Sequence, residues 1–437
     1  MKNFLWMRRR NRNRADKKEA SISDMELTIP CHFRCPISLD LMKDPVSLST
    51  GITYDRESIE KWIDSGHATC PVTNQPLRSF DQIPNHAIRK MIQEWCVENK
   101  SLGVERVPTP HVPIAPYNVS EICSRMLAAT KSGDDLKCQE LVRKIKDLAK
   151  ESERNRRCLV SNGIGGALAD MFEVFASFSV AKHANLLSEI MSALTWSFPT
   201  GEEGVSMLKS EVSLRCMVWF LNGEDLSSRK DAVFVLKEVI SADPKCVDGL
   251  MEIEGIEIAL FNIMKVPICP KATQTCLVIM HQMMMLQCQN SRVITLRFVR
   301  VGLIPLILDI LVEGNKCICE KALGVLDGIC DSKEGKESAY SNALTVPLVV
   351  KKILRVSDIG TDFAISILWK LIVGGDENAV IEVVLLGAFQ KLLVVLQVGC
   401  GEVTKEKVTE LLKLMNMYRD KLDCFDSSME FKQLKRS

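Results

Sequence analysis

The fold of the N-terminal part is decided by the stretch Cys35-Pro36-Ile37-Ser38-Leu39-Asp40-Leu41-Met42-Lys43-Asp44-Pro45-Val46, which a second cysteine–proline pair follows in Cys70-Pro71-Val72-Thr73. After the first motif, Val46 and Leu48 alternate with serines, as apolar and polar residues do in a half-buried strand. Gly51 permits a tight turn, so Ile52-Thr53-Tyr54 is predicted to return as the second strand of a hairpin.

Two helices are predicted to follow this hairpin. Asp55 can cap the first and Asn85 can cap the second, because their side-chain oxygens accept hydrogen bonds from free backbone N–H groups. The stretch from Ile29 to about Asn99 therefore reads as one compact loop–hairpin–helix unit. The apolar residues spaced to form a buried stripe are Ile59, Trp62 and Ile63 in the first helix, and Ile88, Met91, Ile92 and Trp95 in the second.

This order of motifs resembles the U-box, the zinc-free relative of the RING domain in ubiquitin ligases. The remaining chain resembles the companion region of the plant U-box ligases with armadillo repeats. The resemblance implies a mainly α protein, in which a small α+β U-box precedes an α-solenoid of armadillo-type repeats. It also implies a plant source and a role in defence or stress signalling. The location is predicted from other features: reduced thiols indicate the cytoplasm or nucleus, and the basic residues Arg8, Arg9 and Arg10 are of the kind that serve as a nuclear address or contact an anionic membrane surface.

As the resemblance implies it, the ligase docks a ubiquitin-conjugating enzyme that already carries ubiquitin and orients it toward a substrate lysine, so the ligase itself holds no covalent intermediate. The implied docking groove is formed by Ile37 and Leu39 in the first loop, Trp62 on the helix and Pro71 in the second loop. Asn74 stands where many U-boxes carry an arginine, and it lacks the charge and the five-donor fork of that residue. The polar network that takes the place of zinc is assigned to Ser38, Asp44, Asp55, Arg56 and Asn85.

The armadillo region is indicated by a repeat. Gly302-Leu303-Ile304-Pro305-Leu306 is its clearest copy, and helix starts align on residues 168, 214, 258, 305, 347 and 390. A period in the forties is typical of armadillo or HEAT stacking, in which each unit buries one face against its neighbours. Such an array is expected to hold the protein substrate.

The domain prediction divides the chain into five segments. Residues 1–28 are a basic disordered arm, 29–104 the U-box, 105–117 a proline-rich linker, 118–425 the helical repeats and 426–437 a flexible tail. The linker follows from Val107-Pro108-Thr109-Pro110-His111-Val112-Pro113, because alternate prolines favour an extended, semi-stiff chain.

Composition excludes several classes of protein. The 437 residues carry a net charge of +1, which gives no general reason to expect a nucleic-acid partner. No apolar run reaches the length of a membrane span, so no integral membrane segment is expected. The 17 cysteines are odd in number and scattered through helical patterns, which favours reduced thiols.

Three alternatives concern the chemistry. Cys31, His32, Cys35, His67 and Cys70 have spacings that could hold one zinc ion, but a RING domain needs two full sites, so no metal or other cofactor is expected. No cysteine lies in a nucleophile motif with a histidine partner, so no residue is assigned to covalent or acid–base catalysis. The alternative function is a non-catalytic armadillo scaffold in which the U-box serves only docking. The sequence leaves the oligomeric state, the substrate and the conjugating enzyme open.

Overall fold

A computed structural model describes residues 29–105, 107, 114–286, 289–373 and 377–433. The chain forms two compact units, Met1–Val112 and Pro113–Ser437. The predicted basic arm, residues 1–28, and most of the predicted linker lie outside the described residues.

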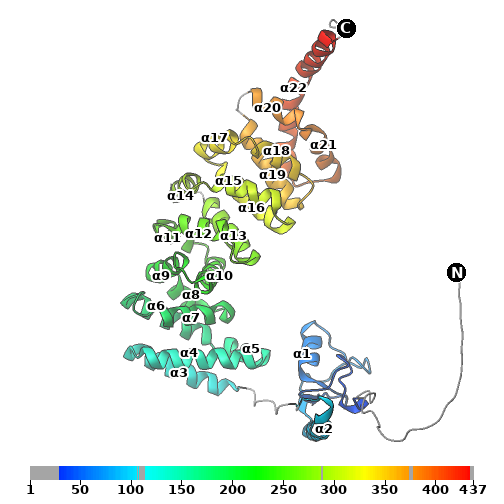
Figure 1. Cartoon of the computed structure of the whole chain (residues 1–437), viewed down its shortest axis with the longest axis vertical. Coiled ribbons are helices and arrows are strands. Elements are labelled where there is room, and N and C mark those ends of the chain that lie inside the picture. The colour runs from blue at the N-terminus through cyan, green and yellow to red at the C-terminus, as the bar shows by residue number, and fades with distance from the viewer. Residues whose placement is uncertain (1–28, 106, 108–113, 287–288, 374–376, 434–437) are drawn as a thin grey trace, which may run out of the picture. The chain divides into compact units, whose positions relative to one another are not determined.

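The first unit is built on a three-stranded antiparallel sheet (Figure 1). Strand β1 (Pro45–Ser47) lies between β2 (Thr53–Asp55) and β3 (Ile83–Pro84), with Val46 opposite both Tyr54 and Pro84. The hairpin matches the sequence prediction, whereas β3 was not predicted because it is only two residues long. The helical elements are η1 (Cys31–Phe33), α1 (Arg56–Asp64), α2 (His86–Glu98) and η2 (Lys100–Leu102).

Two details of these helices differ from the prediction. Asp55 stands at the N-cap position of α1, but its carboxylate makes no capping hydrogen bond there and is used elsewhere, as described below. Met91 is 47% exposed, so the buried stripe of α2 does not include it. Asn85 does cap α2, since its side-chain oxygen accepts the N–H of Ile88 at 3.1 Å.

The packed first unit reaches beyond the predicted boundary at residue 104. Val107 is 6% exposed and belongs to the same apolar core as Ile92 and Cys96. Its carbonyl oxygen accepts a hydrogen bond from Gln93 Nε2 at 3.2 Å. The predicted linker therefore begins too early, because a proline-rich pattern conceals one apolar residue that packs on the core.

The second unit is a stack of helices (Figure 1). Its first helix begins at Pro116, within the segment predicted as linker. The helices are α3 (Pro116–Ser132), α4 (Asp135–Glu151), α5 (Glu153–Ser161), α6 (Ile164–Phe178), α7 (Ala184–Ser197), α8 (Gly201–Leu208), α9 (Glu211–Leu221), α10 (Leu226–Ala242), α11 (Cys246–Glu252), α12 (Ile256–Lys265), α13 (Pro270–Met285), α14 (Gln289–Arg300), α15 (Leu303–Glu313), α16 (Lys316–Ile329), α17 (Lys333–Ser341), α18 (Thr345–Lys352), α19 (Asp358–Ile372), α20 (Glu377–Leu385), α21 (Ala388–Val398) and α22 (Glu402–Gln433).

The repeat predicted from the sequence matches this arrangement. The six aligned positions fall in α6, α9, α12, α15, α18 and α21, and each of these helices is followed by a helix of one continuous layer. That layer consists of α4, α7, α10, α13, α16, α19 and α22, in which each helix packs on the next. Gly302 and Gly387 make the sharp turns into α15 and α21. Their φ angles of 86° and 74° lie in the left-handed region, which other residues rarely adopt.

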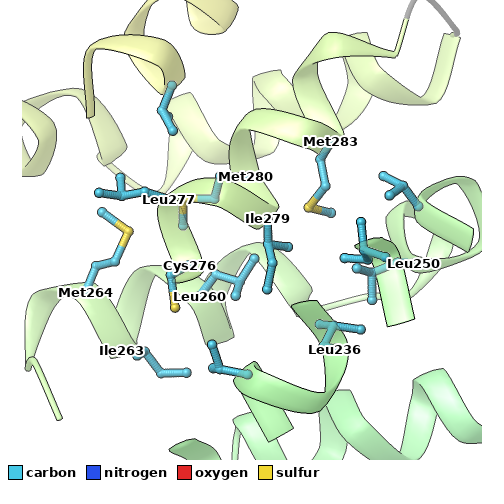
Figure 2. Packing of buried hydrophobic residues seen from close by; sticks show 14 of the residues in the cluster. Leu236, Leu250, Leu260, Ile263, Met264, Cys276, Leu277, Ile279, Met280 and Met283 are labelled. Atoms are coloured by element: carbon cyan, nitrogen blue, oxygen red, sulfur yellow. The ribbon is translucent and has the colours of Figure 1, made fainter. Parts of the chain in front are cut away.

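One apolar core runs through the array. Figure 2 shows its middle, where Cys276, Ile279 and Met283 of α13 lie among side chains of α10, α11 and α12. Because each inner helix of the layer, from α7 to α19, is covered by a neighbour on both sides, the repeats are stabilised mainly by contacts between adjacent units.

The C-terminal prediction is corrected by α22, which continues to Gln433 rather than giving way to a flexible tail at residue 426. In the described part of the chain, no single helix is long and apolar enough to cross a membrane, although the bent pairs α5–α6 and α20–α21 meet that requirement together.

Candidate functional site

Two loops of the first unit are built in the same way. In the first, the N–H of Leu39 donates to the carbonyl oxygen of Cys35 at 2.8 Å, and Leu39 has a φ of 63°. In the second, the N–H of Asn74 donates to the carbonyl oxygen of Cys70 at 2.8 Å, and Asn74 has a φ of 55°. Each loop thus starts at a buried cysteine followed by proline and turns through a left-handed residue four positions later.

Adjacent residues of β2 hold one loop each. The N–H of Asp55 donates to the sulfur of Cys35 at 3.3 Å. The hydroxyl of Tyr54 lies 3.0 Å from the sulfur of Cys70 and accepts the N–H of Val72 at 3.3 Å. Since Tyr54 and Asp55 are neighbours, the two loops are fixed to the same strand.

The buried sulfurs act as hydrogen-bond acceptors. Burial opposes ionisation of Cys70, but hydrogen bonds from Thr50, Thr73 and Tyr54 outweigh it together and lower the pKa of the thiol to about 6. Hydrogen bonds within the first loop and from Asp55 likewise lower the pKa of Cys35 against the effect of burial. Burial, together with its contact with Cys70, raises the pKa of Tyr54, so its hydroxyl stays protonated and can donate to the sulfur.

Trp62 ties the central helix α1 to the second loop. Its indole Nε1 donates to the carbonyl oxygen of Thr69 at 2.8 Å. The ring of His67 stacks on the indole, with the ring centres 4.0 Å apart and the planes 19° apart. Trp62 is half-buried and packs against the apolar core, so it supports the second loop from α1.

The side chains predicted to dock a partner divide into exposed and half-buried ones. Leu39 is 64% exposed and Asn74 is also exposed, whereas Ile37 and Pro71 are half-buried. Val72, which is 51% exposed, was missed. The sequence did contain a signal for it, because Val72 follows Cys70-Pro71 as Ile37 follows Cys35-Pro36.

The polar network is centred on Asp44. Its carboxylate accepts from Arg56 Nε at 2.7 Å and from the guanidinium of Arg89, and Arg56 also donates to Gln82 Oε1 at 3.1 Å. These contacts join the end of β1 to α1, to α2 and to the segment before β3. Arg89 and Gln82 were not predicted, because nothing local in the sequence connects them to Asp44.

Asp55 and Asn85 complete the network around the sheet. The carboxylate of Asp55 accepts the N–H groups of Lys43 and Asp44, both at 2.8 Å, while burial raises its pKa. The amide of Asn85 donates to Ser47 Oγ and Thr53 Oγ1, each at 3.3 Å, in addition to capping α2.

Ser38 makes its contacts within the first loop. Its side chain is exposed, and its hydroxyl accepts the N–H of Asp40 at 3.4 Å within the first loop. Ser38 also stabilises the thiolate of Cys35. Its assignment to the polar network stays a prediction, since its contacts lie within the first loop and reach the sheet only through the sulfur of Cys35, which accepts the N–H of Asp55.

The side chains considered as zinc ligands are used differently. Cys35 and Cys70 bond to protein donors, His67 stacks on Trp62, and Cys31 is exposed. Within the described ranges, no three histidine, cysteine or acidic side chains are grouped as a metal site would require. The metal-free state of the domain stays a prediction.

Comparisons with known proteins agree with both halves of the chain. Residues 29–101 match the U-box domain, and residues 118–435 match the plant U-box protein ARM repeat region. The chain belongs to the plant U-box proteins. Among these plant U-box proteins, it is 46% identical to U-box domain-containing protein 21 of Arabidopsis thaliana, over 99% of both chains. It is 34% identical to E3 ubiquitin-protein ligase PUB22 of the same plant, over 90% of this chain and 95% of the relative.

Proposed function

We propose that this protein is a ubiquitin ligase whose U-box docks a ubiquitin-loaded conjugating enzyme and whose armadillo repeats hold the protein to be modified. The observation that carries the proposal is the pair of matched loops, which present Ile37 and Leu39 on one side and Pro71 and Asn74 on the other. An exposed leucine on a strand-anchored loop is a suitable anchor for a partner, because apolar contacts at the centre of an interface dominate its affinity.

The chemistry proposed for the ligase is orientation. The Cys70 thiolate is fully buried and bonded to Tyr54, so it is placed to hold the loop rather than to attack a thioester. A loaded conjugating enzyme brings its own activated ubiquitin, and restraining that flexible conjugate beside a substrate lysine raises the rate by proximity. We place this reaction in the cytoplasm, where thiols stay reduced, and a role in defence or stress signalling stays a prediction of the family resemblance.

The rigid polar network suits this role. Asp44, Arg56 and Arg89 connect β1, α1 and α2, so the two loops stand on a framework that does not depend on the partner for its shape. A preformed surface loses little conformational entropy on binding, which favours affinity for the conjugating enzyme.

The test is transfer of ubiquitin from loaded conjugating enzymes to free lysine, measured with the full-length chain. We expect Ile37→Ala to slow transfer at least about tenfold, since truncation of an interface anchor costs about 2 kcal/mol or more. Val97→Ala, on the exposed side of α2, is the matched control and should keep the wild-type rate. If the wild-type chain accelerates transfer from no member of a panel of conjugating enzymes, the non-catalytic scaffold is the correct function.

A further inference from the structure

A row of exposed apolar side chains follows one edge of the armadillo array. They lie at or next to the C-terminal ends of α12, α15, α18 and α21. In each case the chain then turns into the following helix of the long-helix layer, which is α13, α16, α19 or α22. Their positions, 266, 312, 354 and 398, recur with the period of the repeat itself. The exposed fractions are 65% for Val266, 59% for Val312, 43% for Leu354 and 73% for Val398.

A second row comes from the starts of the long helices. Leu226 is the first residue of α10, whereas Ile359 and Val403 are the second residues of α19 and α22. They are 54%, 56% and 66% exposed. Since these helices begin directly after the turns, both rows belong to the same edge of the array.

Two hydrogen bonds show that the starts of α16, α19 and α22 lie side by side, and a cation–π contact joins α13 to α10. Lys271 at the start of α13 lies over the ring of Phe234 at 5.2 Å, which places this start against the middle of α10. Ser357 donates to Glu320 Oε2 of α16 at 2.6 Å. Thr404 donates in the same way to Asp362 Oδ1 of α19 at 2.7 Å. The two rows therefore form one continuous strip, which we name the apolar edge and define by Val266, Val312, Leu354, Ile359, Val398 and Val403.

Leu354 shows that this exposure is not a by-product of folding. Its φ is 62°, and its N–H donates to Thr361 Oγ1 at 3.1 Å. A branched residue is disfavoured in this left-handed conformation by about 1–2 kcal/mol, and glycine would fit the turn without that cost. Single exposed apolar residues are ordinary, but their recurrence in register along successive repeats is typical of an interaction site.

The apolar edge is flanked by basic side chains between α12 and α19. Lys265, Lys316, Lys351 and Arg355 are exposed, and in the described part of the structure none of them pairs with a carboxylate. Four acidic side chains, Glu313, Glu320, Asp358 and Asp362, lie at the same turns. Lys271, Lys321 and Lys352 lie there too, so positive charge predominates. Lysines farther along the long helices differ, since Lys146 of α4 pairs with Glu189 and Lys370 of α19 pairs with Asp327 and Asp331.

We propose that the apolar edge between α12 and α19 docks an acidic amphipathic helix of a partner protein. Packed helices lie about 8–10 Å apart, and a helix rises about 1.5 Å per residue. Apolar residues about seven positions apart on the docked helix would therefore meet Val266, Val312 and Leu354 in turn. Glutamates and aspartates beside that stripe would pair with the unpaired lysines, while the layer of long helices stays open to a substrate.

Two other occupants fit the charge less well. The N-terminal residues of this chain carry Arg8, Arg9, Arg10, Arg12 and Arg14, and like charges would repel them from the edge. If a second copy of the array docked by the same edge, its lysines would face the lysines of the first copy and repel them. An acidic partner meets complementary charge along the whole strip.

The probe is a labelled synthetic helix of about 18 residues with leucine on one face and glutamate on the other, titrated with the full-length chain by fluorescence anisotropy. A peptide with lysine in place of glutamate is its counterpart. We expect the acidic peptide to bind and the basic one to bind at least about tenfold more weakly. The double variant Val312→Glu, Leu354→Glu should weaken the acidic peptide at least about tenfold, and Lys316→Glu, Lys351→Glu at least about fivefold.

The matched control is Leu385→Glu, at the end of α20 and 71% exposed, which should leave the affinity unchanged. Circular dichroism melting of every variant excludes unfolding as the cause of a loss. Absence of binding by the acidic peptide, equal binding of both peptides, or an unchanged affinity of the Val312→Glu, Leu354→Glu variant would each overturn the proposal. Concentration-dependent dimerisation that Val312→Glu abolishes in sedimentation would assign the edge to a second copy instead.

Discussion

Leu39 and Asn74 occupy the same backbone position in the two loops of the U-box, since each has a positive φ and each donates its N–H to the cysteine four residues earlier. Asparagine tolerates this conformation, whereas leucine is disfavoured in it. Leu39 is also 64% exposed, so the core does not require it. A disfavoured and exposed leucine is best explained by a contact with another molecule.

We predict that Leu39→Gly separates stability from activity. Glycine relieves about 1–2 kcal/mol of left-handed strain but makes the unfolded chain more flexible by a similar amount, so the free energy of unfolding should change by less than about 1 kcal/mol. Loss of the leucine should slow ubiquitin discharge from the conjugating enzyme at least about tenfold. Urea unfolding and the discharge assay measure the two effects. Discharge at the wild-type rate would remove Leu39 from the docking surface.

A second prediction concerns Trp62, which bonds to Thr69 and carries the stacked ring of His67. Trp62→Ala should lower the free energy of unfolding by at least about 2 kcal/mol, because a packed ring and a hydrogen bond are lost together. Trp62→Phe keeps a ring but not the indole N–H, so its free energy of unfolding should lie between those of the wild type and Trp62→Ala. A Trp62→Ala unfolding curve that overlays the wild type would show that Trp62 serves docking alone.

The elements of the U-box that were predictable are those with local causes. The turn at Gly51 and the cap at Asn85 each depend on residues within four positions, and such patterns are visible in a sequence. The repeats were predictable for a related reason, because the same helix start recurs along the chain. The two loops were assigned to docking through the family resemblance, and this role stays a prediction, whereas their matched backbone geometry became visible only in the structure.

The missed features depend on contacts between distant residues. Arg89 reaches Asp44 across 45 positions, and neither helix periodicity nor capping rules connect them. Asp55 was assigned as a cap because it precedes a helix, but the N–H groups of Lys43 and Asp44 compete for the same carboxylate. Where two local rules offer one side chain different partners, the tertiary fold decides between them.

The third prediction tests the double role of Asn85. Asn85→Ala removes both the cap of α2 and the hydrogen bonds to Ser47 and Thr53, so the free energy of unfolding should fall by about 1–3 kcal/mol. Asn85→Asp keeps an oxygen for the Ile88 N–H but no amide to donate, so it should recover part of the loss. If Asn85→Asp is no more stable than Asn85→Ala in urea, the cap contributes nothing and the bonds to the sheet account for the whole effect.

The fourth prediction is a pH dependence set by Cys70. Its pKa of about 6 lies below the ordinary thiol value of about 8.5. Between these two pH values, Cys70 is a thiolate in the folded state and a protonated thiol in the unfolded state. The stabilisation is complete above about pH 8.5 and is lost as the pH falls through about 6. The absorbance of thiolate at 240 nm should rise with a midpoint near pH 6 in the wild type and not in Cys70→Ser. Cys216→Ser is the control, since burial raises the pKa of Cys216 to about 12.

The last prediction concerns where the U-box ends. Val107 is buried in its core and accepts a hydrogen bond from Gln93, so residues 1–112 should form a more stable fragment than residues 1–104. Burial of one valine is worth about 1.5–3 kcal/mol, which for a domain of this size corresponds to a melting temperature several degrees higher. Val107→Ser in the longer fragment should reproduce most of the loss. Both fragments should still discharge ubiquitin from the conjugating enzyme, because both contain the two loops that start at Cys35 and Cys70. Equal melting of the two fragments would return the boundary to residue 104, and failure of residues 1–112 to fold would show that the U-box depends on the repeats.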